Sequence, residues 1–142
     1  MNIIKVRAFD GVEMRYDITG LECNPDGRVS GVHIDGDYYH LNKETFTLHP
    51  LAELMIFTGL KDVNGVLIYE GDIVKVTTDS EDLDSDFLHE VKYKSSAGCF
   101  PIDVHGDYDL TTMHWAVDTH HYIYEVIGNI YQNSEPIKMD GE

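Results

Sequence analysis

Residues 58–76 read TGLKDVNGVLIYEGDIVKV and combine two turn signals with two strand signals. Asn64-Gly65 predicts a two-residue hairpin turn of type I′, because both central positions of that turn need a positive φ. Residues 66–69 form a short apolar run, which Glu70-Gly71-Asp72 interrupts. Residues 73–77 begin a second run, rich in β-branched side chains. The stretch therefore predicts two neighbouring strands with a tight corner at Gly71.

The N-terminal side of this stretch reads as a meander of short hairpins. Apolar and polar residues alternate over several short segments, which is the pattern of half-buried strands. Asp10-Gly11, Asn24-Pro25-Asp26-Gly27 and Asp35-Gly36 separate these segments and carry turn chemistry. The predicted strands cover residues 3–9, 12–18, 28–34 and 37–41.

Residues 48–57 allow two interpretations. Pro50 can open a helical turn, and Leu51, Leu54 and Met55 have the i, i+3, i+4 spacing of a helix. Residues 55–57 also suit a buried strand. We expect at most one turn of helix and then a strand that leads into residue 58.

The C-terminal side contains more predicted strands around an acidic loop. Residues 79–86 hold five acids in eight positions and predict an exposed loop. Strands are expected at residues 87–93 and 122–131, with a bulge or bend at Gly128. Residues 113–117, which include the only tryptophan, are expected to form a short strand or turn.

The predicted fold class is all-β, with little helix. Short strands at regular spacing favour a small barrel or sandwich, and the five strands expected over 57–131 fit an SH3-like barrel. We expect an N-terminal β-hairpin extension over residues 1–56. The barrel core, with the acidic loop 79–86 and a short C-terminal tail, would span residues 57–142.

The charge of the chain limits its partners. Twenty-six acids and ten bases give a formal net charge of −16. Such a surface repels phosphate backbones and anionic lipids, so neither direct nucleic-acid binding nor membrane binding is expected. It attracts basic proteins or cations, or it simply keeps the protein soluble.

The cysteines and the apolar runs predict a cytoplasmic protein. Cys23 and Cys99 are too few to form a disulfide framework and have no zinc-finger spacing, so reduced, partly buried thiols are expected. The N-terminus does not have the pattern of a signal peptide, and the apolar runs are too short to span a bilayer.

Three motifs in order resemble the signature of the YopX family of phage and prophage proteins. The central motif is residues 58–74, of the form TGLKDxNGxxIYEGDIV. Residues 4–10 (IKVRAFD) are similar to the family's opening IKFRAWD, and residues 125–133 (EVIGNIYQN) to its closing EVIGNIYEN. Val6 and Phe9 depart from the aromatic residues usual in the family, and residues 79–86 and 105–121 match no pattern of it.

The resemblance implies a small phage-encoded β protein with an SH3-like barrel that associates with itself. The family has no established biochemical activity and no assigned catalytic residues. The resemblance therefore transfers no catalytic, cofactor-binding or metal-binding residue to this chain.

Two groups of residues invite a metal interpretation. Asp82, Asp84 and Asp86 have the spacing that begins an EF-hand loop. Phe87 and Tyr93, however, occupy the positions that need glycine and a bidentate glutamate. A solvated acidic loop is the simpler interpretation.

The second group lies between residues 105 and 121 and offers imidazole and carboxylate ligands for a transition metal. On a strand, the adjacent His120 and His121 would point to opposite faces. Exposed histidines are the alternative. The candidate ligands are His105, Asp107, His114, Asp118, His120 and His121.

Catalytic interpretations are weaker than structural ones. Cys99 as a nucleophile would need a basic neighbour, whereas residues 77–142 carry three bases and fourteen acids, so core packing is expected. Glu70 and Asp72 can be imagined as a carboxylate pair, but beside Gly71 they are expected to bind backbone N–H groups.

An aromatic set in the second half can line a peptide groove, although core packing or a subunit interface is favoured. Its members are Tyr108, Trp115, Tyr122 and Tyr124.

The sequence thus predicts a non-enzymatic protein that acts through protein–protein contacts or as a homo-oligomer, with an unidentified protein partner and no cofactor. The alternative is an acidic DNA mimic that occupies a host nucleic-acid-binding protein. A metal-dependent hydrolase is a third hypothesis.

Overall fold

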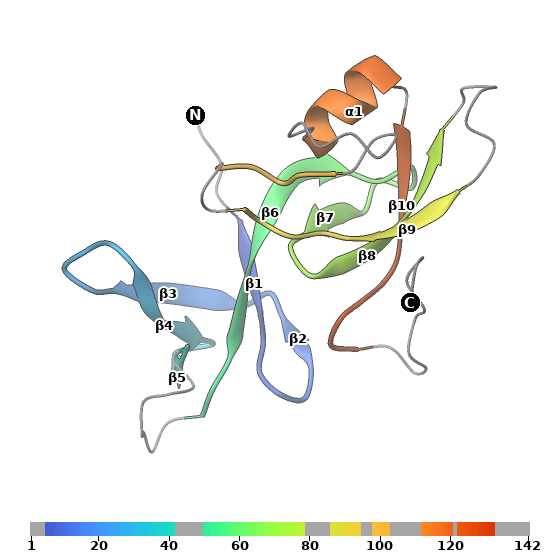
Figure 1. The fold of residues 1–142 in the computed structure, drawn as a ribbon. Helices are drawn as coiled ribbons and strands as arrows, with labels where there is room; N and C mark the ends of the chain where they lie inside the picture. The colour runs from blue at the N-terminus through green and yellow to red at the C-terminus, as the bar shows by residue number, and fades with distance from the viewer. Residues whose placement is uncertain are drawn as a thin grey trace. The chain divides into compact units, whose positions relative to one another are not determined.

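The computed structural model describes residues 5–41, 50–78, 86–94, 98–102, 112–120 and 122–132. The chain divides into two compact units, residues 1–57 and 58–142. Strands dominate the described residues and one short helix accompanies them (Figure 1), which confirms the predicted, mainly β class. The elements are β1 (Val6–Phe9), β2 (Met14–Arg15), β3 (Ile18–Cys23), β4 (Val29–Ile34), β5 (Asp37–His40), β6 (Glu53–Lys61), β7 (Leu67–Tyr69), β8 (Asp72–Thr78), β9 (Phe87–Glu90), α1 (Met113–His120) and β10 (Tyr122–Asn129).

The first unit contains the predicted meander. β3, β4 and β5 form an antiparallel sheet in that order, and β1 pairs with both β2 and β6. Asp35 and Gly36 have φ values of 48° and 87°, as a two-residue type I′ turn requires. The expected strand over 12–18 is wrong in extent, because only Met14 and Arg15 pair with β1 before β3 begins. The buried core of the unit consists of Ala8, Val32, Ile34 and Ala52.

Residues 50–55 do not form the expected helical turn. The His40 amide donates to the Pro50 carbonyl (2.8 Å) and the Ala52 amide donates to the His40 carbonyl (3.0 Å). These bonds hold the segment extended beside β5, and β6 follows from Glu53. Pairing with β5 thus overrides the helical spacing of the leucines. Residues 42–49 lie outside the described part of the chain.

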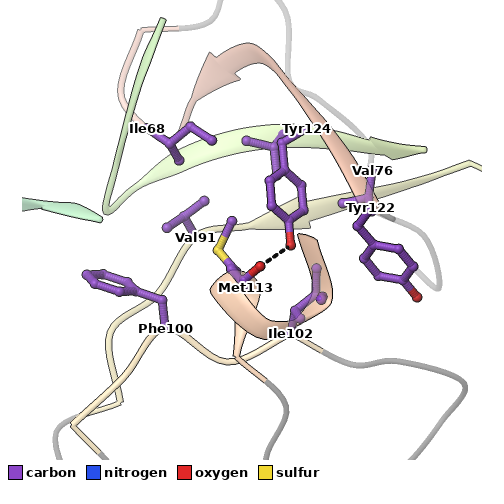
Figure 2. Packing of buried hydrophobic residues seen from close by; sticks show 10 residues of the cluster. Ile68, Val76, Val91, Phe100, Ile102, Met113, Tyr122 and Tyr124 are labelled. Carbon is purple, nitrogen blue, oxygen red and sulfur yellow. Dashed lines mark hydrogen bonds between the residues drawn. The ribbon is translucent and has the colours of Figure 1, made fainter. Parts of the chain in front are cut away.

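The second unit has a larger core. β8 pairs with β10 on one side and β9 on the other, and the curled strands give the small barrel-like fold that the sequence predicts. Figure 2 shows the core side chains that these elements enclose. In their midst the Tyr124 hydroxyl donates a hydrogen bond of 2.9 Å to the Met113 carbonyl, joining β10 to the start of α1. The buried cluster consists of Ile68, Val74, Val76, Val91, Phe100, Ile102, Met113, Ala116, Tyr122 and Tyr124.

Residues 113–117 are helical, so the predicted strand or turn is wrong. Met113 and Ala116 are fully buried and Val117 packs against the same core, an i, i+3, i+4 pattern. The Ala116 amide donates to the Thr112 carbonyl, which closes the first turn of α1. The period of the buried side chains therefore decides the conformation of this segment.

The turn at Asn64-Gly65 is present but is not of type I′. Gly65 has a φ of 84°, whereas Asn64 does not have a positive φ. The Gly65 amide donates to the Asp62 carbonyl (3.0 Å), and the Asp62 amide donates to the Val66 carbonyl (2.8 Å). This is a three-residue loop, a type I turn followed by a left-handed glycine.

The Asp62 carboxylate explains this turn and connects it to β10. Its Oδ1 accepts hydrogen bonds from the amides of Asn64 and Val66, both at 2.8 Å. Its Oδ2 accepts one from the Val126 amide at 3.0 Å. The Val63 amide adds a bond of 2.9 Å to the Tyr124 carbonyl. The loop after β6 is therefore attached to a strand more than sixty residues further along the chain.

The Asp62 carboxylate is ionised in this position. Burial raises its pKa, but the backbone amides of Val126, Val66, Asn64 and Gly65 together lower the pKa below the usual 3.8. Because only the charged form accepts bonds on both oxygens without a proton, ionisation and turn geometry support each other.

The predicted corner at Gly71 is confirmed. Gly71 has a φ of 89°; its amide donates to the Val91 carbonyl (2.8 Å), and its carbonyl accepts from Ile130 (3.0 Å). Asp72 accepts a bond of 2.8 Å from the Tyr69 amide, as expected of a turn carboxylate. The Thr58 hydroxyl donates to the Ile68 carbonyl (2.7 Å) and so connects β6 with β7.

His89 places an imidazole ring in the second unit, and one of its two nitrogens has no hydrogen-bond partner. Its side chain lies on the same face of the chain as Phe87 of β9 and Val91 just after that strand, both of which belong to the core. Its ring bonds to the backbone of Pro101, whose carbonyl is the available acceptor, and its buried Nε2 has no hydrogen-bond partner. Burial lowers the pKa of His89 to about 4, the Pro101 bond opposes this shift, and the charge of Lys92 adds to it.

We predict that Asp62→Ala destabilises the protein by about 3 kcal/mol, because three amides lose a charged acceptor. Urea unfolding followed by the fluorescence of Trp115 measures the change. Asn24→Ala is the matched control: Asn24 begins a turn with the same two backbone bonds, yet is exposed. A loss of stability in Asp62→Ala no larger than in the control would contradict the role of the carboxylate.

We also predict a pH dependence that originates in His89. The unfolded chain binds a proton near pH 6.5 and the folded chain near pH 4, so stability is greatest above pH 6.5 and falls by about 3 kcal/mol on going to pH 4. Unfolding curves across this range should show that slope in the wild type and in His114→Leu, which removes an exposed histidine. They should lose most of it in His89→Leu, apart from the shallow fall near pH 4 that Asp10, Asp17 and Asp62 contribute because their pKa values are lowered. An unchanged slope in His89→Leu would refute the assignment.

Candidate interaction surface

β10 exposes a row of aliphatic side chains on its outer face. Tyr122 and Tyr124 point into the core, whereas Ile123 and Ile127 are 44% and 41% exposed. Ile130, just past the end of the strand, is 46% exposed. Exposed aliphatic residues are ordinary when they are scattered, but a row on one strand is typical of a contact surface.

The predicted irregularity at Gly128 is confirmed and shapes this row. Val126 pairs with Val74 and Gly128 pairs with Ile73, so Ile127 is the extra residue of a β-bulge. A bulge changes the direction of the side chains that it carries. Here it accompanies an isoleucine exposed to solvent.

The loop after β6 exposes two more aliphatic side chains beside β10. Val63 is 61% exposed and Val66 is 48% exposed, and the Val63 amide bonds to the carbonyl of Tyr124 in the middle of β10. We call the set Val63, Val66, Ile123, Ile127 and Ile130 the aliphatic face.

Polar groups lie within the aliphatic face, where Glu125 stands between Ile123 and Ile127, and on the neighbouring strand. Glu125 of β10 pairs in register with Lys75 of β8, and both are exposed. Lys75 Nζ also lies 3.4 Å from the Asp86 carboxylate. Charges of both signs therefore occur here, although the chain as a whole is strongly acidic.

The same loop blocks part of the edge of β10. The Val63 amide donates to the carbonyl of Tyr124, and the Asp62 carboxylate accepts from the amide of Val126. Free backbone groups on an edge strand invite pairing with another chain, so covering them is a common protective device. A partner would thus meet the side chains of this face rather than the backbone of residues 124–126.

The aromatic set is resolved in favour of core packing where the structure describes it. Tyr122 is 4% exposed and Tyr124 is 3% exposed, so neither lines a groove. Trp115 belongs to α1. Tyr108 lies outside the described residues.

The structure also places the candidate turn carboxylate Asp72 and the two cysteines. Asp72 is 2% exposed and binds a backbone amide, as the turn interpretation predicts for this carboxylate. Both cysteines are free; Cys99 is half-buried in a bridge with Lys94, whereas Cys23 is exposed, contrary to the expectation of partial burial.

The metal hypotheses concern residues that the structure describes only in part. His114 is exposed on α1, and a Cβ added at Gly59 would lie 3.5 Å from its Nε2. Asp86 pairs with Lys75. In the described ranges, His, Cys, Asp and Glu residues form no group of three able to hold a metal ion. His105, Asp107, His121, Asp82 and Asp84 lie outside those ranges, so both hypotheses stay predictions.

Two features of the second unit were not predicted from the sequence: the loop that lies beside β10 and the burial of the His89 ring. The alternation of residues 122–127 shows which side chains of β10 face outwards, but the loop beside them depends on a contact between distant residues. The burial of the His89 ring had a weak signal, since positions 87, 89 and 91 share one face of an extended chain and two of them are apolar. No helix in the described part of the chain has the length or the apolar character needed to cross a bilayer.

Comparison with known proteins agrees with this architecture. The family model described as YopX protein matches residues 5–138. The SPbeta prophage-derived uncharacterized protein YopX of Bacillus subtilis (strain 168) is 33% identical over 137 residues, covering 91% of this chain and 92% of that protein.

Two solved structures extend the comparison. The crystal structure of yopX from Bacillus subtilis matches with a TM-score of 0.59 and 30% identity, covering 97% of this chain and all of that one. Protein EF1440 from Enterococcus faecalis matches with a TM-score of 0.59 and 25% identity, covering 95% and 98% of the two chains. Since the family match and the relatives span almost the whole sequence, the chain belongs to the YopX family.

Proposed function

We propose that this phage-derived protein acts by protein–protein contact, without catalysis, and that the aliphatic face is the contact surface. The observation that carries the proposal is the outward row of Ile123, Ile127 and Ile130, joined by the valines of the loop after β6. Apolar side chains gain free energy when a partner removes them from water, at about 25 cal/mol per Å².

A second copy of the chain is the first partner we propose. With a net charge of −16, two copies repel each other over most of their surfaces. The aliphatic face is a place where this repulsion is weak, because Lys75 lies beside Glu125. In a two-fold arrangement the lysine of each copy can meet the glutamate of the other.

We place the protein in the cytoplasm, which is consistent with two free cysteines.

The DNA-mimic alternative has less support. A mimic needs free carboxylates spread over a surface, whereas many described acids bind local partners. Asp10 and Asp17 bind Arg15, and Asp62 and Asp72 bind backbone amides. Capture of host DNA-binding proteins from a lysate, lost at high salt, would favour mimicry over our proposal.

We predict that Ile127→Asp weakens self-association by about tenfold or more, because it removes an apolar contact and adds a desolvated charge. Light scattering and sedimentation equilibrium on the full chain measure the change. Val12→Asp adds the same charge at a side chain that is 85% exposed in the first unit, and should leave association unaltered.

Two further measurements separate the possible causes. Ile127→Lys should weaken association as well, although it makes the net charge of each copy less negative. Circular dichroism should show the wild-type fold in each variant. High salt should strengthen association of the wild type because it screens the repulsion between copies. A wild-type protein that stays monomeric at high concentration and high salt would refute self-association through this face.

A further inference from the structure

The sheet of the first unit has a polar face built around two glycines. In register, Gly20 of β3 lies opposite His33 of β4, which lies opposite Tyr38 of β5. The next row on the same face is Glu22, Gly31 and His40. Val32 and Ile34, on the other face of β4, are buried. The six positions therefore form two rows of three on the side of the sheet opposite those buried residues.

Each glycine makes room for a ring from the neighbouring strand. A Cβ at Gly31 would lie 2.4 Å from the Tyr38 hydroxyl, so the phenol end of Tyr38 fills the place of the missing side chain. A Cβ at Gly20 would lie 3.5 Å from the His33 ring. Both rings thus lean along the sheet, towards β3, where Glu22 is located.

The result is a connected strip of three rings and a carboxylate. The His33 and Tyr38 ring centroids are 5.3 Å apart with planes at 59°, and those of Tyr38 and His40 are 6.1 Å apart at 89°. His33 Nε2 lies 3.1 Å from Glu22 Oε1. We call Glu22, His33, Tyr38 and His40 the ring strip.

From this geometry we propose that the ring strip binds an arginine side chain on a basic segment of a partner protein. A guanidinium group is attracted to aromatic rings and forms charge-assisted hydrogen bonds with a carboxylate. The ring strip offers both: a tyrosine set between two inclined rings, and a carboxylate at its end. The contact with His33 uses one oxygen of Glu22, and a carboxylate has about four acceptor sites.

Charge and exposure favour this ligand. Residues 18–41 carry four acids and one base, and that base, Arg28, lies 3.6 Å from Asp26. The Glu22 side chain is 53% exposed and that of His33 is 32% exposed. A cationic segment is thus attracted to this sheet and can reach the carboxylate. The site lies in the first unit and is independent of the aliphatic face.

We predict that the full chain binds a hexa-arginine peptide more tightly than a hexa-lysine peptide, as measured by calorimetry. Glu22→Gln should weaken hexa-arginine binding about fivefold, and Tyr38→Leu by a similar factor. Asp26→Asn removes the same charge from the turn between β3 and β4 and should change the affinity less than about twofold, since only non-specific attraction is lost.

Gly31→Ala tests the arrangement without removing any ligand group. The new methyl must displace the Tyr38 phenol, so hexa-arginine binding should weaken while all four side chains of the ring strip are retained. Circular dichroism establishes that each variant is folded. Equal binding of the two peptides, or equal losses in Glu22→Gln and Asp26→Asn, would overturn the proposal. The same peptides should bind normally to Ile127→Asp, which separates this proposal from the one on self-association.

Discussion

The second unit depends on one buried carboxylate that is bound entirely by backbone. Asp62 accepts bonds from Asn64 and Val66 in its own loop and from Val126 in β10. A hydrogen bond to a charged group contributes about 1.5–3 kcal/mol, and its loss leaves a buried amide without a partner. The carboxylate thus decides the geometry of the turn, the position of the loop and the protection of the β10 edge. The aliphatic face exists in its present form because this loop lies beside β10.

Sequence reasoning succeeded where a local rule decides the structure. The glycines at 36, 65 and 71 have the positive φ values that their turns need, and the short strands between turns follow the alternation of apolar residues. The three motifs of residues 4–10, 58–74 and 125–133 identified the family. Their order matters physically, because the second and third motifs meet through Asp62 and Val126 and through Gly71 and Ile130.

It failed where a side-chain contact or tertiary packing decides the local structure. The turn at residues 63–65 differs from type I′ because the side chain of Asp62 binds its amides. Residues 50–55 are extended because β5 binds them, and residues 113–117 are helical because the core accepts one face of a helix. The aliphatic face and the ring strip could not be predicted from the sequence for a similar reason. The isoleucines of β10 and the rings around Gly31 become surfaces only when register and loop packing place them together. Both surfaces are the contact sites that we propose.

Gly71 gives the second unit a particular order of assembly. Its amide and carbonyl bind Val91 and Ile130, and the Asp62 carboxylate binds Val126. The segment near residue 70 thus has partners that are twenty to sixty residues away. Contacts between residues distant in sequence slow folding, because the chain loses loop entropy before it gains the contact. During synthesis the described strands β1 to β5 of the first unit are made early, whereas the second unit lacks β10, its last described strand, until residue 129 has been added. The loop of residues 62–66 is therefore synthesised well before β10, the strand that it binds.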